Sequence, residues 1–472
     1  MVFSSNIFLL YFLPAFLVLY FVTPNRFRNY TLLLASLIFY AYGAPDFIIQ
    51  LTASTILNFF LVRFMCKAEK QSVRKLLCGI SIFVSLGLLA YYKYGNFTME
   101  NINAIRGLFG SEPVEWMKIL LPIGISFFTF QSITYTVDTY RGINQPMRKL
   151  SDYIVYIMMF PQLIAGPIVR YNEIAGQIEH REHKWSECLH GFYRFVIGLS
   201  KKILIADVLG RWVDGMLIED LATLDTATAW IVIAAYTMQL YFDFSGYSDM
   251  AIGLGRMMGF SFPENFDNPY NSASISEFWR RWHITLGSFM RNYLYIPLGG
   301  NRCSKPRMYF NLWVVFLLSG LWHGASWNFV IWGAYHGFFL VMERLFLGKV
   351  YKRIGKVPSV LITFILVMVG WAIFRIENIG DCWTFITRLF SFDFASVRHI
   401  GDPHFVTTLL VALAFSFVAL FGFGKKMQNF VYYTEYSSWQ HIVVWIVAMF
   451  LLLFSIAALN VSSFSPFIYF RF

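Results

Sequence analysis

Charged side chains are scarce in this sequence: Asp, Glu, Lys and Arg make up 14% of its 472 residues. Soluble domains usually carry about 25%, so the composition excludes an ordinary soluble fold. Hydrophobic residues account for 57%, and the mean hydropathy is +0.54. A membrane-spanning helix needs about 20 apolar residues, so this composition predicts a membrane protein that crosses the bilayer many times. The net charge of +11 then indicates basic cytoplasmic loops and not a nucleic-acid surface.

Cysteine is rare, and its positions follow no pattern. There is no Cys-x-x-Cys pair and no regular spacing among Cys66, Cys78, Cys188, Cys303 and Cys382. This argues against a disulfide framework and a zinc site, and we expect no bound metal. The sequence also lacks internal repeats, low-complexity stretches and the basic region and cleavage site of a signal peptide. The first apolar run therefore predicts a retained span with its N-terminus outside.

Apolar runs, in contrast, are abundant. Candidate spans lie at 7–22, 29–42, 46–65, 76–92, 118–136, 151–168, 190–208, 227–244, 309–323, 326–347, 357–374, 403–421 and 440–458. Several are short for a bilayer, so we expect roughly 10–12 true spans together with re-entrant helices. Lys and Arg cluster in alternate loops of the first half, which supports the outside N-terminus. We interpret residues 1–472 as one transmembrane domain with N-terminal spans (1–117), a central core (about 118–347) and C-terminal spans (357–472).

The longest polar interruption runs from Ser245 to Lys305. Its basic residues outnumber its acidic residues, which places it on the cytoplasmic side. It contains no run long enough to cross a bilayer, but it is rich in aromatic residues and glycine turns. We therefore expect a folded intramembrane loop and not a linker.

A helix is predicted after Ser274 within this stretch. Ser274 is a typical N-cap residue, and Glu277 three positions later completes a capping box. Apolar residues and one histidine then recur at spacings of three and four, which places them on one face of a helix: Ile275, Trp279, His283, Leu286 and Met290. The residues alone leave two interpretations of His283 open, a core histidine bonded to a carbonyl group or a functional ring.

Two further histidines lie in the apolar segment SGLWHGASWNFVIWGAYHGFFL. His323 and His336 each follow an aromatic residue and precede a glycine. An ionisable group inside a membrane is usually functional or paired, and a glycine behind the ring allows close approach of backbone or substrate. Residues 324–326 predict a helix break after His323, where a neutral imidazole can accept a proton near neutral pH. For His336 we favour an interhelical hydrogen bond.

Two aspartates also lie in apolar surroundings, in QLYFDFSGYSDMAIG. Asp243 and Asp249 could orient a histidine or pair with a buried arginine, or they could cap the ends of broken helices. Gly246 and the neighbouring serines predict a turn between them.

Basic residues surround the turn sequence PLGG. A glycine turn with cations could receive the phosphates of a nucleotide-bearing acyl donor, although the positive-inside bias explains the charges equally well. The set comprises Arg291, Arg302, Lys305 and Arg307.

The C-terminal sequence NVSSFSPFIYFRF places Tyr469 among phenylalanines. Two interpretations stay open. The segment is an aromatic anchor at the membrane interface, or its phenol accepts an acyl group transiently.

Long, ordered motifs of this chain together resemble the membrane-bound O-acyltransferase (MBOAT) family, and within it the bacterial branch that acetylates alginate, peptidoglycan and cellulose. The resemblance extends along the whole chain. Its motifs are GISFFTFQSITYTVDTYRG (124–142), FPQLIAGPIVRY (160–171), LSKKILIAD (199–207), LYFDFSGYSDMAIGLG (240–255), FPENFDNPYNSASISEFWRRWHITL (262–286), YLYIPLGGNR (293–302) and GLWHGASWNFVIWGAYHG (320–337).

The resemblance implies a ring of tilted helices around a central funnel, in the cell inner membrane. It implies acetyl transfer from cytoplasmic acetyl-CoA to an extracytoplasmic polysaccharide, first of all an alginate-like polymer. The two histidines of the family correspond to His283 in FWRRWH and His323 in LWHG. We expect His323 to be the base, His283 to assist it, and His336 to brace the wall.

The resemblance also implies a partner. In relatives, a separate extracytoplasmic SGNH-type acetyltransferase completes the transfer, and Tyr469 is the candidate acyl relay toward it. Substrate or partner choice is expected in the outer loop from Gly95 to Lys118, which is poor in basic residues. The competing class is a proton-coupled transporter of an acyl-carrying small molecule or lipid; such transporters usually show internal repeats. A third interpretation, a scaffold of an envelope complex, would leave the histidines unnecessary.

Overall fold

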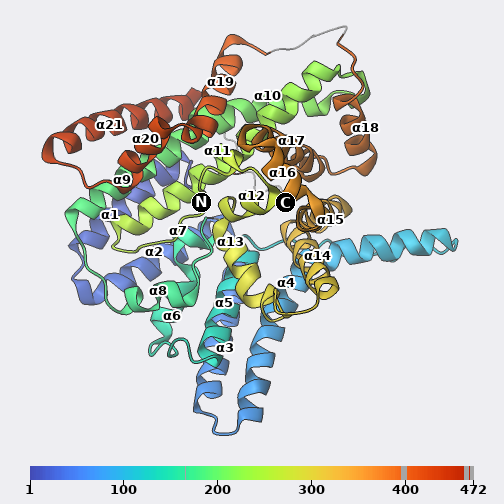
Figure 1. The fold of residues 1–472 in the computed structure, drawn as a ribbon. Coiled ribbons are helices and arrows are strands. Elements are labelled where there is room, and N and C mark those ends of the chain that lie inside the picture. The colour runs from blue at the N-terminus through green and yellow to red at the C-terminus, as the bar shows by residue number, and fades with distance from the viewer. Residues whose placement is uncertain (165, 395–400, 462–466, 468–472) are drawn as a thin grey trace. The chain divides into compact units, whose positions relative to one another are not determined.

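Helices joined by loops make up the part of the chain that the computed structural model describes (Figure 1). That part comprises residues 1–164, 166–394, 401–461 and 467. Among these residues, β-pairing is confined to one isolated bridge, between Phe266 and Trp282. The all-α prediction is confirmed. The chain divides into two compact units, and one domain over residues 1–472 stays a prediction.

The first unit holds Met1–Leu189 and Leu254–Pro263. Its helices are η1 (Ile7–Phe12), α1 (Leu13–Val22), η2 (Asn25–Phe27), α2 (Arg28–Gly43), η3 (Pro45–Phe47), α3 (Ile48–Lys67), α4 (Gln71–Leu108), α5 (Ile125–Tyr140), α6 (Leu150–Met158), α7 (Phe160–Leu163) and α8 (Tyr171–Glu179). Buried polar side chains join three of them. Asn58 of α3 donates to Ser81 of α4 at 2.7 Å, and the Ser81 hydroxyl lies 2.7 Å from that of Thr136 in α5. Such interhelical bonds hold helices together where lipid removes the hydrophobic drive.

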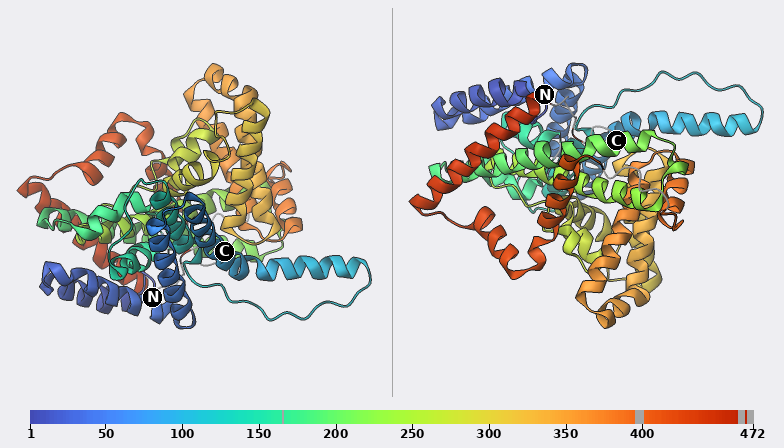
Figure 2. Two further views of the ribbon diagram at one scale, coloured as in Figure 1. Left: turned by 90° about the horizontal axis from the view of Figure 1, so that it is seen from below. Right: turned by 90° about the horizontal axis from the view of Figure 1, so that it is seen from above.

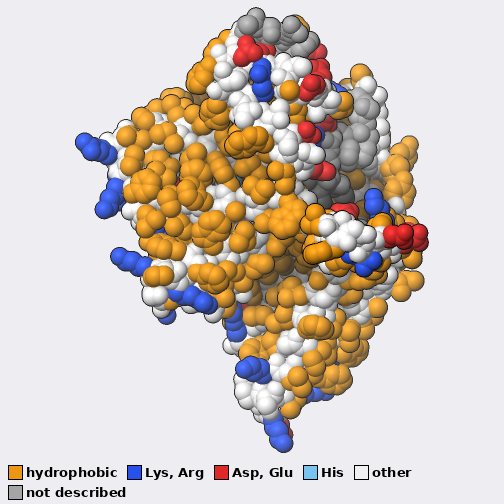
Figure 3. Space-filling model, turned by 90° about the vertical axis from the view of Figure 1, so that its right-hand side faces the viewer, with side chains coloured by type: hydrophobic (Ala, Val, Ile, Leu, Met, Phe, Trp, Pro, Cys, Tyr) orange, Lys and Arg blue, Asp and Glu red, His pale blue; other side chains and the backbone are white. Residues whose placement is uncertain are grey.

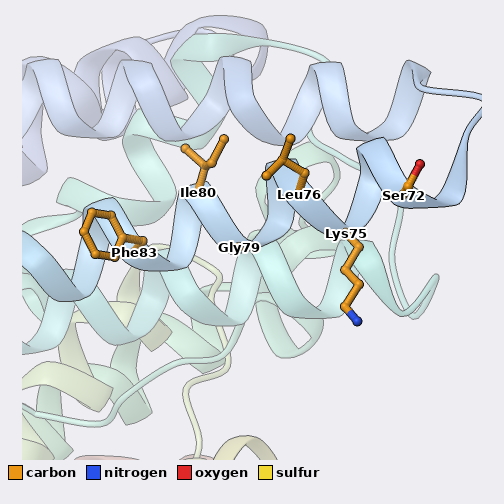
Figure 4. Close-up of a pocket in the computed structure, with 6 residues that line it drawn as sticks. All are labelled: Ser72, Lys75, Leu76, Gly79, Ile80 and Phe83. Atoms are coloured by element: carbon orange, nitrogen blue, oxygen red, sulfur yellow. The ribbon is translucent and has the colours of Figure 1, made fainter.

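Helix α4 is long and mostly exposed along its apolar part. Leu76 and Phe83 are 62% and 76% exposed, and Figure 4 shows them on one side of α4 with Ile80 between them and Lys75 pointing away. A shallow hollow lined by these side chains marks this outer surface. Beyond α4 an extended loop runs back beside the helix (Figure 2). An apolar, unburied face of this kind fits contact with lipid.

The second unit holds His190–Gly253 and Glu264–Phe472. The helices that lie largely within it are α9 (Trp185–Ser200), η4 (Lys201–Ala206), α10 (Asp207–Ile218), η5 (Leu221–Thr223), α11 (Thr226–Met257), η6 (Pro269–Asn271), α12 (Ile275–Arg281), α13 (Ile284–Phe289), η7 (Met290–Tyr295), α14 (Lys305–His323), α15 (Trp327–Met342), η8 (Glu343–Leu347), α16 (Gly348–Ile354), α17 (Lys356–Arg375), α18 (Ile379–Leu389), α19 (Pro403–Phe417), η9 (Val418–Leu420), α20 (Gly422–Tyr433) and α21 (Ser438–Val461).

The turn predicted at Gly246 is wrong, because α11 runs without interruption from Thr226 to Met257. The first part of the predicted polar loop is therefore helix. The glycine serves packing instead. A Cβ on Gly246 would lie 2.7 Å from the backbone oxygen of Gly198 in α9, so only a residue without a side chain lets the two helices approach so closely.

Helices α14 and α15 pack against each other in the same way. A Cβ on Gly320 would collide with the Phe329 carbonyl, and one on Gly333 with the Phe316 carbonyl. The connection between them spans residues 324–326, so the break predicted directly after His323 is confirmed. This tight pair places His323 at the end of one helix and His336 within the other.

Six helices of the described chain are long and apolar enough to cross a bilayer. They are Pro45–Lys67, Gln71–Leu108, Trp327–Ile354, Lys356–Arg375, Pro403–Leu420 and Ser438–Val461. Hydrophobic side chains cover much of the face drawn in Figure 3. These features confirm a polytopic membrane protein, while the count of 10–12 spans stays a prediction.

Candidate active site

His283 lies in the break between α12 and α13, where its side chain is 1% exposed. Helix α12 begins at the predicted cap: Ser274 Oγ accepts a hydrogen bond from the Glu277 N–H at 3.1 Å. The Glu277 carboxylate turns back to accept from the Ala273 N–H at 2.9 Å. The prediction of a continuous helical face from Ile275 to Met290, however, is wrong.

The helix stops because other backbone groups compete for its hydrogen bonds. The Asp267 N–H donates to the Arg281 carbonyl at 2.9 Å, and the Ile284 N–H donates to the Asn265 carbonyl at 3.0 Å. His283, between these two bonds, has left-handed backbone angles of φ 46° and ψ 53°. A non-glycine residue in this region is uncommon and often marks a functional site.

Asn265 determines which nitrogen of His283 carries the proton. Its Oδ1 accepts from the Thr285 N–H at 3.3 Å and hydroxyl at 2.9 Å, while its Nδ2 donates to Ser248 Oγ at 3.0 Å. Because an N–H can only donate, the atom facing it must be the amide oxygen. The same oxygen lies 3.1 Å from His283 Nδ1, so Nδ1 bears the hydrogen.

The lone pair of the neutral His283 ring is therefore on Nε2. This atom is buried and has no hydrogen-bond partner among the described residues. Burial lowers the pKa of His283 to about 3, so the ring is uncharged at physiological pH. The arrangement gives a neutral hydrogen-bond acceptor with a fixed tautomer.

His323 is the last residue of α14 and is 6% exposed. Among the described residues, three aromatic rings meet it edge to face: Trp322 at 4.9 Å between centroids, Trp332 at 5.1 Å and Phe374 at 5.4 Å. The glycine that follows is also required by packing, since a Cβ on Gly324 would collide with the Phe329 ring. The imidazole thus lies buried among aromatic rings at a helix end.

Two tryptophans bring the three predicted histidines together. Trp322 contacts both His323 and, at 6.1 Å between centroids, His283. Trp332 contacts both His323 and, at 5.0 Å, His336. The order His283, Trp322, His323, Trp332, His336 forms one aromatic cluster, which we call the histidine–tryptophan cluster.

His336 differs from the prediction. Its ring is fully buried, and neither nitrogen has a hydrogen-bond partner among the residues the structure describes, so the expected interhelical hydrogen bond is absent there. Trp279 and Trp332 enclose the ring edge to face, each 5.0 Å away, and Gly370 of α17 lies against it. The ring is held by aromatic packing and not by a polar partner.

Asp249 and Asp243 form ion pairs. Asp249 accepts from Arg194 at 2.9 Å and from Lys201 at 2.6 Å. Asp243 lies 3.0 Å from Lys202, which also pairs with Asp207. Of the open interpretations, pairing with a buried arginine therefore holds for Asp249, whereas the partner of Asp243 is a buried lysine. Capping of broken helices does not hold, because α11 is unbroken.

The predicted phosphate-binding residues lie on the surface. Arg291 is in η7, Arg302 is in the turn before α14, and Lys305 begins α14; all three are exposed. Gly299 and Gly300 have positive φ angles of 111° and 54°, which confirms the glycine turn of PLGG. Phosphate binding stays a prediction.

Tyr469 lies outside the described residues, so its role stays a prediction.

Two residues of the site were not predicted from the sequence. Asn265 was missed, although it belongs to the motif FPENFDNPYN, because nothing in its spacing links it to His283. Glu343 was also missed: its carboxylate accepts from the Ile275 and Ser276 N–H groups and so caps α12 from a distant part of the chain.

Comparison with known proteins bears directly on this site. The model of the MBOAT, membrane-bound O-acyltransferase family matches residues 115–374, which include all three histidines. The chain is 41% identical to the probable alginate O-acetylase AlgI of Azotobacter vinelandii over the full length of both. It is 43% identical to the protein of that name from Pseudomonas aeruginosa, over 90% of this chain and 82% of the relative. It is 34% identical to the peptidoglycan O-acetyltransferase of Helicobacter pylori, over 85% and 82%.

The chain belongs to the membrane-bound O-acyltransferase family. It is a multi-pass membrane enzyme that transfers acyl groups to oxygen. Family membership favours the enzyme over the transporter and scaffold interpretations.

Proposed function

We propose that this enzyme takes acetyl groups from cytoplasmic acetyl-CoA and moves them across the cell inner membrane for O-acetylation of an extracytoplasmic polysaccharide. An alginate-like polymer is the first choice, because the most similar relatives reported above are named alginate O-acetylases. Peptidoglycan is the second candidate, supported by the Helicobacter relative. A cellulose-like polymer rests on the motif resemblance alone.

One observation carries the chemical part of the proposal: His283 and His323 both contact one buried tryptophan, Trp322. In the transfer, an acceptor hydroxyl attacks the thioester carbonyl, a C–O bond forms, and the C–S bond to CoA breaks. His323 takes the hydroxyl proton and returns it to the leaving thiolate, so that no net charge is left in the dry site. His283, neutral and oriented by Asn265, assists as a hydrogen-bond acceptor through Nε2, which helps to position the acceptor before His323 removes its proton.

The proposed transfer across the membrane needs a donor site, a carrier of the acetyl group and a partner outside. Arg291, Arg302 and Lys305 form the candidate contact for the phosphates of acetyl-CoA. Tyr469 is the candidate relay that carries the acetyl group as a phenyl ester. An SGNH-type acetyltransferase outside the membrane would then deliver it to the polymer.

The test uses the purified full chain in detergent or liposomes with radiolabelled acetyl-CoA, and follows the release of CoA thiol. His323→Ala is expected to lower the rate at least about 100-fold, the usual contribution of a general base. His441→Ala, a histidine outside the histidine–tryptophan cluster, is the matched control and is expected to keep the rate. Equal turnover in His323→Ala and wild type would overturn the assignment of the base.

Label on the protein separates the relay from the base. If Tyr469 carries the acetyl group, Tyr469→Phe abolishes protein-bound label. The CoA that this variant still releases then comes from attack of water on the thioester, with His323 as the base. Label that persists in Tyr469→Phe removes the relay from the cycle without affecting the base.

A further inference from the structure

A cavity of about 780 Å³ lies in the second unit, and none of the three clustered histidines lines it. Residues of α9, η4, α11, α19, η9, α20 and α21 form its wall. Its volume is within the range of sites that bind small molecules in proteins. The cavity has a polar end and an apolar end, so one ligand can place a charged group at the first and a hydrocarbon chain at the second.

Four charged side chains form the polar end. Arg194 bonds Asp249 at 2.9 Å and Glu264 at 2.6 Å, and Lys201 bonds the other Asp249 oxygen at 2.6 Å. Two cations and two carboxylates give a formal sum of zero. The more exposed members carry opposite charges: Glu264 is 34% and Lys201 20% exposed, against 9% and 8% for Arg194 and Asp249.

This arrangement matches a dipolar headgroup better than an anion. The Lys201 ammonium has three N–H groups, and Asp249 accepts one of them. Lys201 can therefore also donate to a phosphate, while the Glu264 carboxylate can accept from an ammonium group. A ligand with one negative and one positive group can place the first beside Lys201 and the second beside Glu264. An anionic headgroup is instead repelled by the Glu264 carboxylate.

Membrane-spanning helices form the apolar end. Phe415 of α19 and Val447 of α21 line the cavity and are 55% and 52% exposed. Both helices are among the six candidate spans. Because these residues line the cavity and are also exposed on spanning helices, hydrocarbon chains can enter the cavity from the bilayer.

We propose that this cavity binds a zwitterionic phospholipid with a primary ammonium headgroup, of the phosphatidylethanolamine class. Its phosphate contacts Lys201, its ammonium contacts Glu264, and an acyl chain lies along α19 and α21. This inference concerns a site distinct from the histidine–tryptophan cluster and does not depend on the acyl donor or acceptor proposed above.

The test is native mass spectrometry of the full chain, delipidated in detergent and titrated with three synthetic lipids. Phosphatidylethanolamine carries N–H donors, phosphatidylcholine has the same charges without N–H donors, and phosphatidylglycerol is anionic. We expect phosphatidylethanolamine to bind roughly tenfold more tightly than phosphatidylcholine, as one charge-assisted hydrogen bond allows. Tightest binding of phosphatidylglycerol, or equal binding of all three, would overturn the proposal.

Two variants place the lipid in this cavity. Val447 lines the cavity and Ile446 does not, although the two are neighbours on α21 with similar exposure, 52% and 56%. Val447→Trp is expected to reduce phosphatidylethanolamine occupancy at least fivefold, roughly what filling part of a site costs, while Ile446→Trp leaves it unchanged. Equal occupancy in the two variants would show that the lipid binds elsewhere.

Glu264→Gln tests the headgroup separately. It keeps the shape of the side chain but removes the charge that faces the ammonium. The preference for phosphatidylethanolamine over phosphatidylcholine is expected to fall to about onefold to threefold. A preference that survives this change contradicts the role of Glu264.

Discussion

The histidine–tryptophan cluster joins ionisable rings and indoles in alternation, and this pairing affects what the imidazoles can do. An uncharged imidazole tolerates an aromatic, water-poor environment, whereas a charged one needs a counter-ion or an electron-rich ring. The Trp322 and Trp332 centroids lie 4.9 Å and 5.1 Å from His323, within the reach of a cation–π contact. If His323 accepts the hydroxyl proton as proposed, the two indoles partly stabilise the imidazolium that forms.

Asn265→Asp tests the tautomer of His283. A carboxylate beside Nδ1 raises the pKa of His283 from its present value of about 3, because an opposite charge favours the imidazolium. The neutral form is then lost below the new pKa and returns as the pH rises through it. We expect CoA release by the variant to fall roughly 10- to 100-fold at mildly acidic pH and to recover with increasing pH, while wild type shows no titration of His283 there.

Asn311→Asp provides the control for this prediction. Asn311 is a fully buried asparagine that donates to the Leu298 carbonyl, outside the cluster. Its substitution introduces a similar charge without facing His283 and is expected to leave the shape of the pH profile unchanged. A profile of Asn265→Asp that parallels wild type contradicts the tautomer assignment.

Among the secondary-structure elements, α11 contains a glycine that allows close packing against a neighbouring helix and does not interrupt α11 itself. Gly246 lets α9 come close enough that a Cβ would lie 2.7 Å from the Gly198 oxygen. Backbone cannot yield as a flexible side chain can, so an added methyl group must push the helices apart.

Gly246→Ala is therefore expected to destabilise the protein by about 1–3 kcal/mol, as overpacking does. Gly215→Ala in α10 is the matched control, because nothing lies within 4 Å of the position of its Cβ. There the change is expected to stabilise by up to about 1 kcal/mol, the difference in helix propensity. Thermal unfolding in detergent measures both, and a shift of the same sign in the two variants contradicts the packing argument.

The elements also show what could be predicted from the sequence. The Ser274 cap and the break after His323 were predicted, because capping and helix-breaking residues act over a few positions. The end of α12 before His283 was not, since it depends on backbone bonds from Asn265 and Asp267, many residues earlier. The helical spacing alone could not reveal that competition.

For the molecule as a whole, composition and hydrophobic runs predicted a polytopic membrane protein, and its motifs predicted the family. The sequence named three histidines as candidates for the site, but it did not predict which side chains would surround them. Trp322 adjoins His323 in the sequence, and Trp332 precedes His336 by one helical turn. The contacts of Trp322 with His283 and of Trp332 with His323 arise only in the folded chain. Side-chain neighbours across helices are set by packing, which periodicity does not encode.

The predicted topology can be tested by labelling single cysteines in a cysteine-free background. The basic loop between α3 and α4 is expected inside, and the loop after α4 outside. A membrane-impermeant maleimide is therefore expected to label Ser111→Cys in intact cells and Glu69→Cys only after permeabilisation. Both positions are exposed, so accessibility alone does not distinguish them. The reverse labelling pattern would show that the chain has the opposite orientation in the membrane.

Helix α4 changes direction along its 38 residues: its first part runs beside α3, and its far part extends at a steep angle to that direction (Figure 1). In the far part Asn103 bonds both the N–H and the carbonyl of Val114, which ties the returning loop to the helix. A soluble enzyme that docks on this arm would therefore meet the helix and its tethered loop together, as one firm ledge that projects sideways from the spanning part of α4.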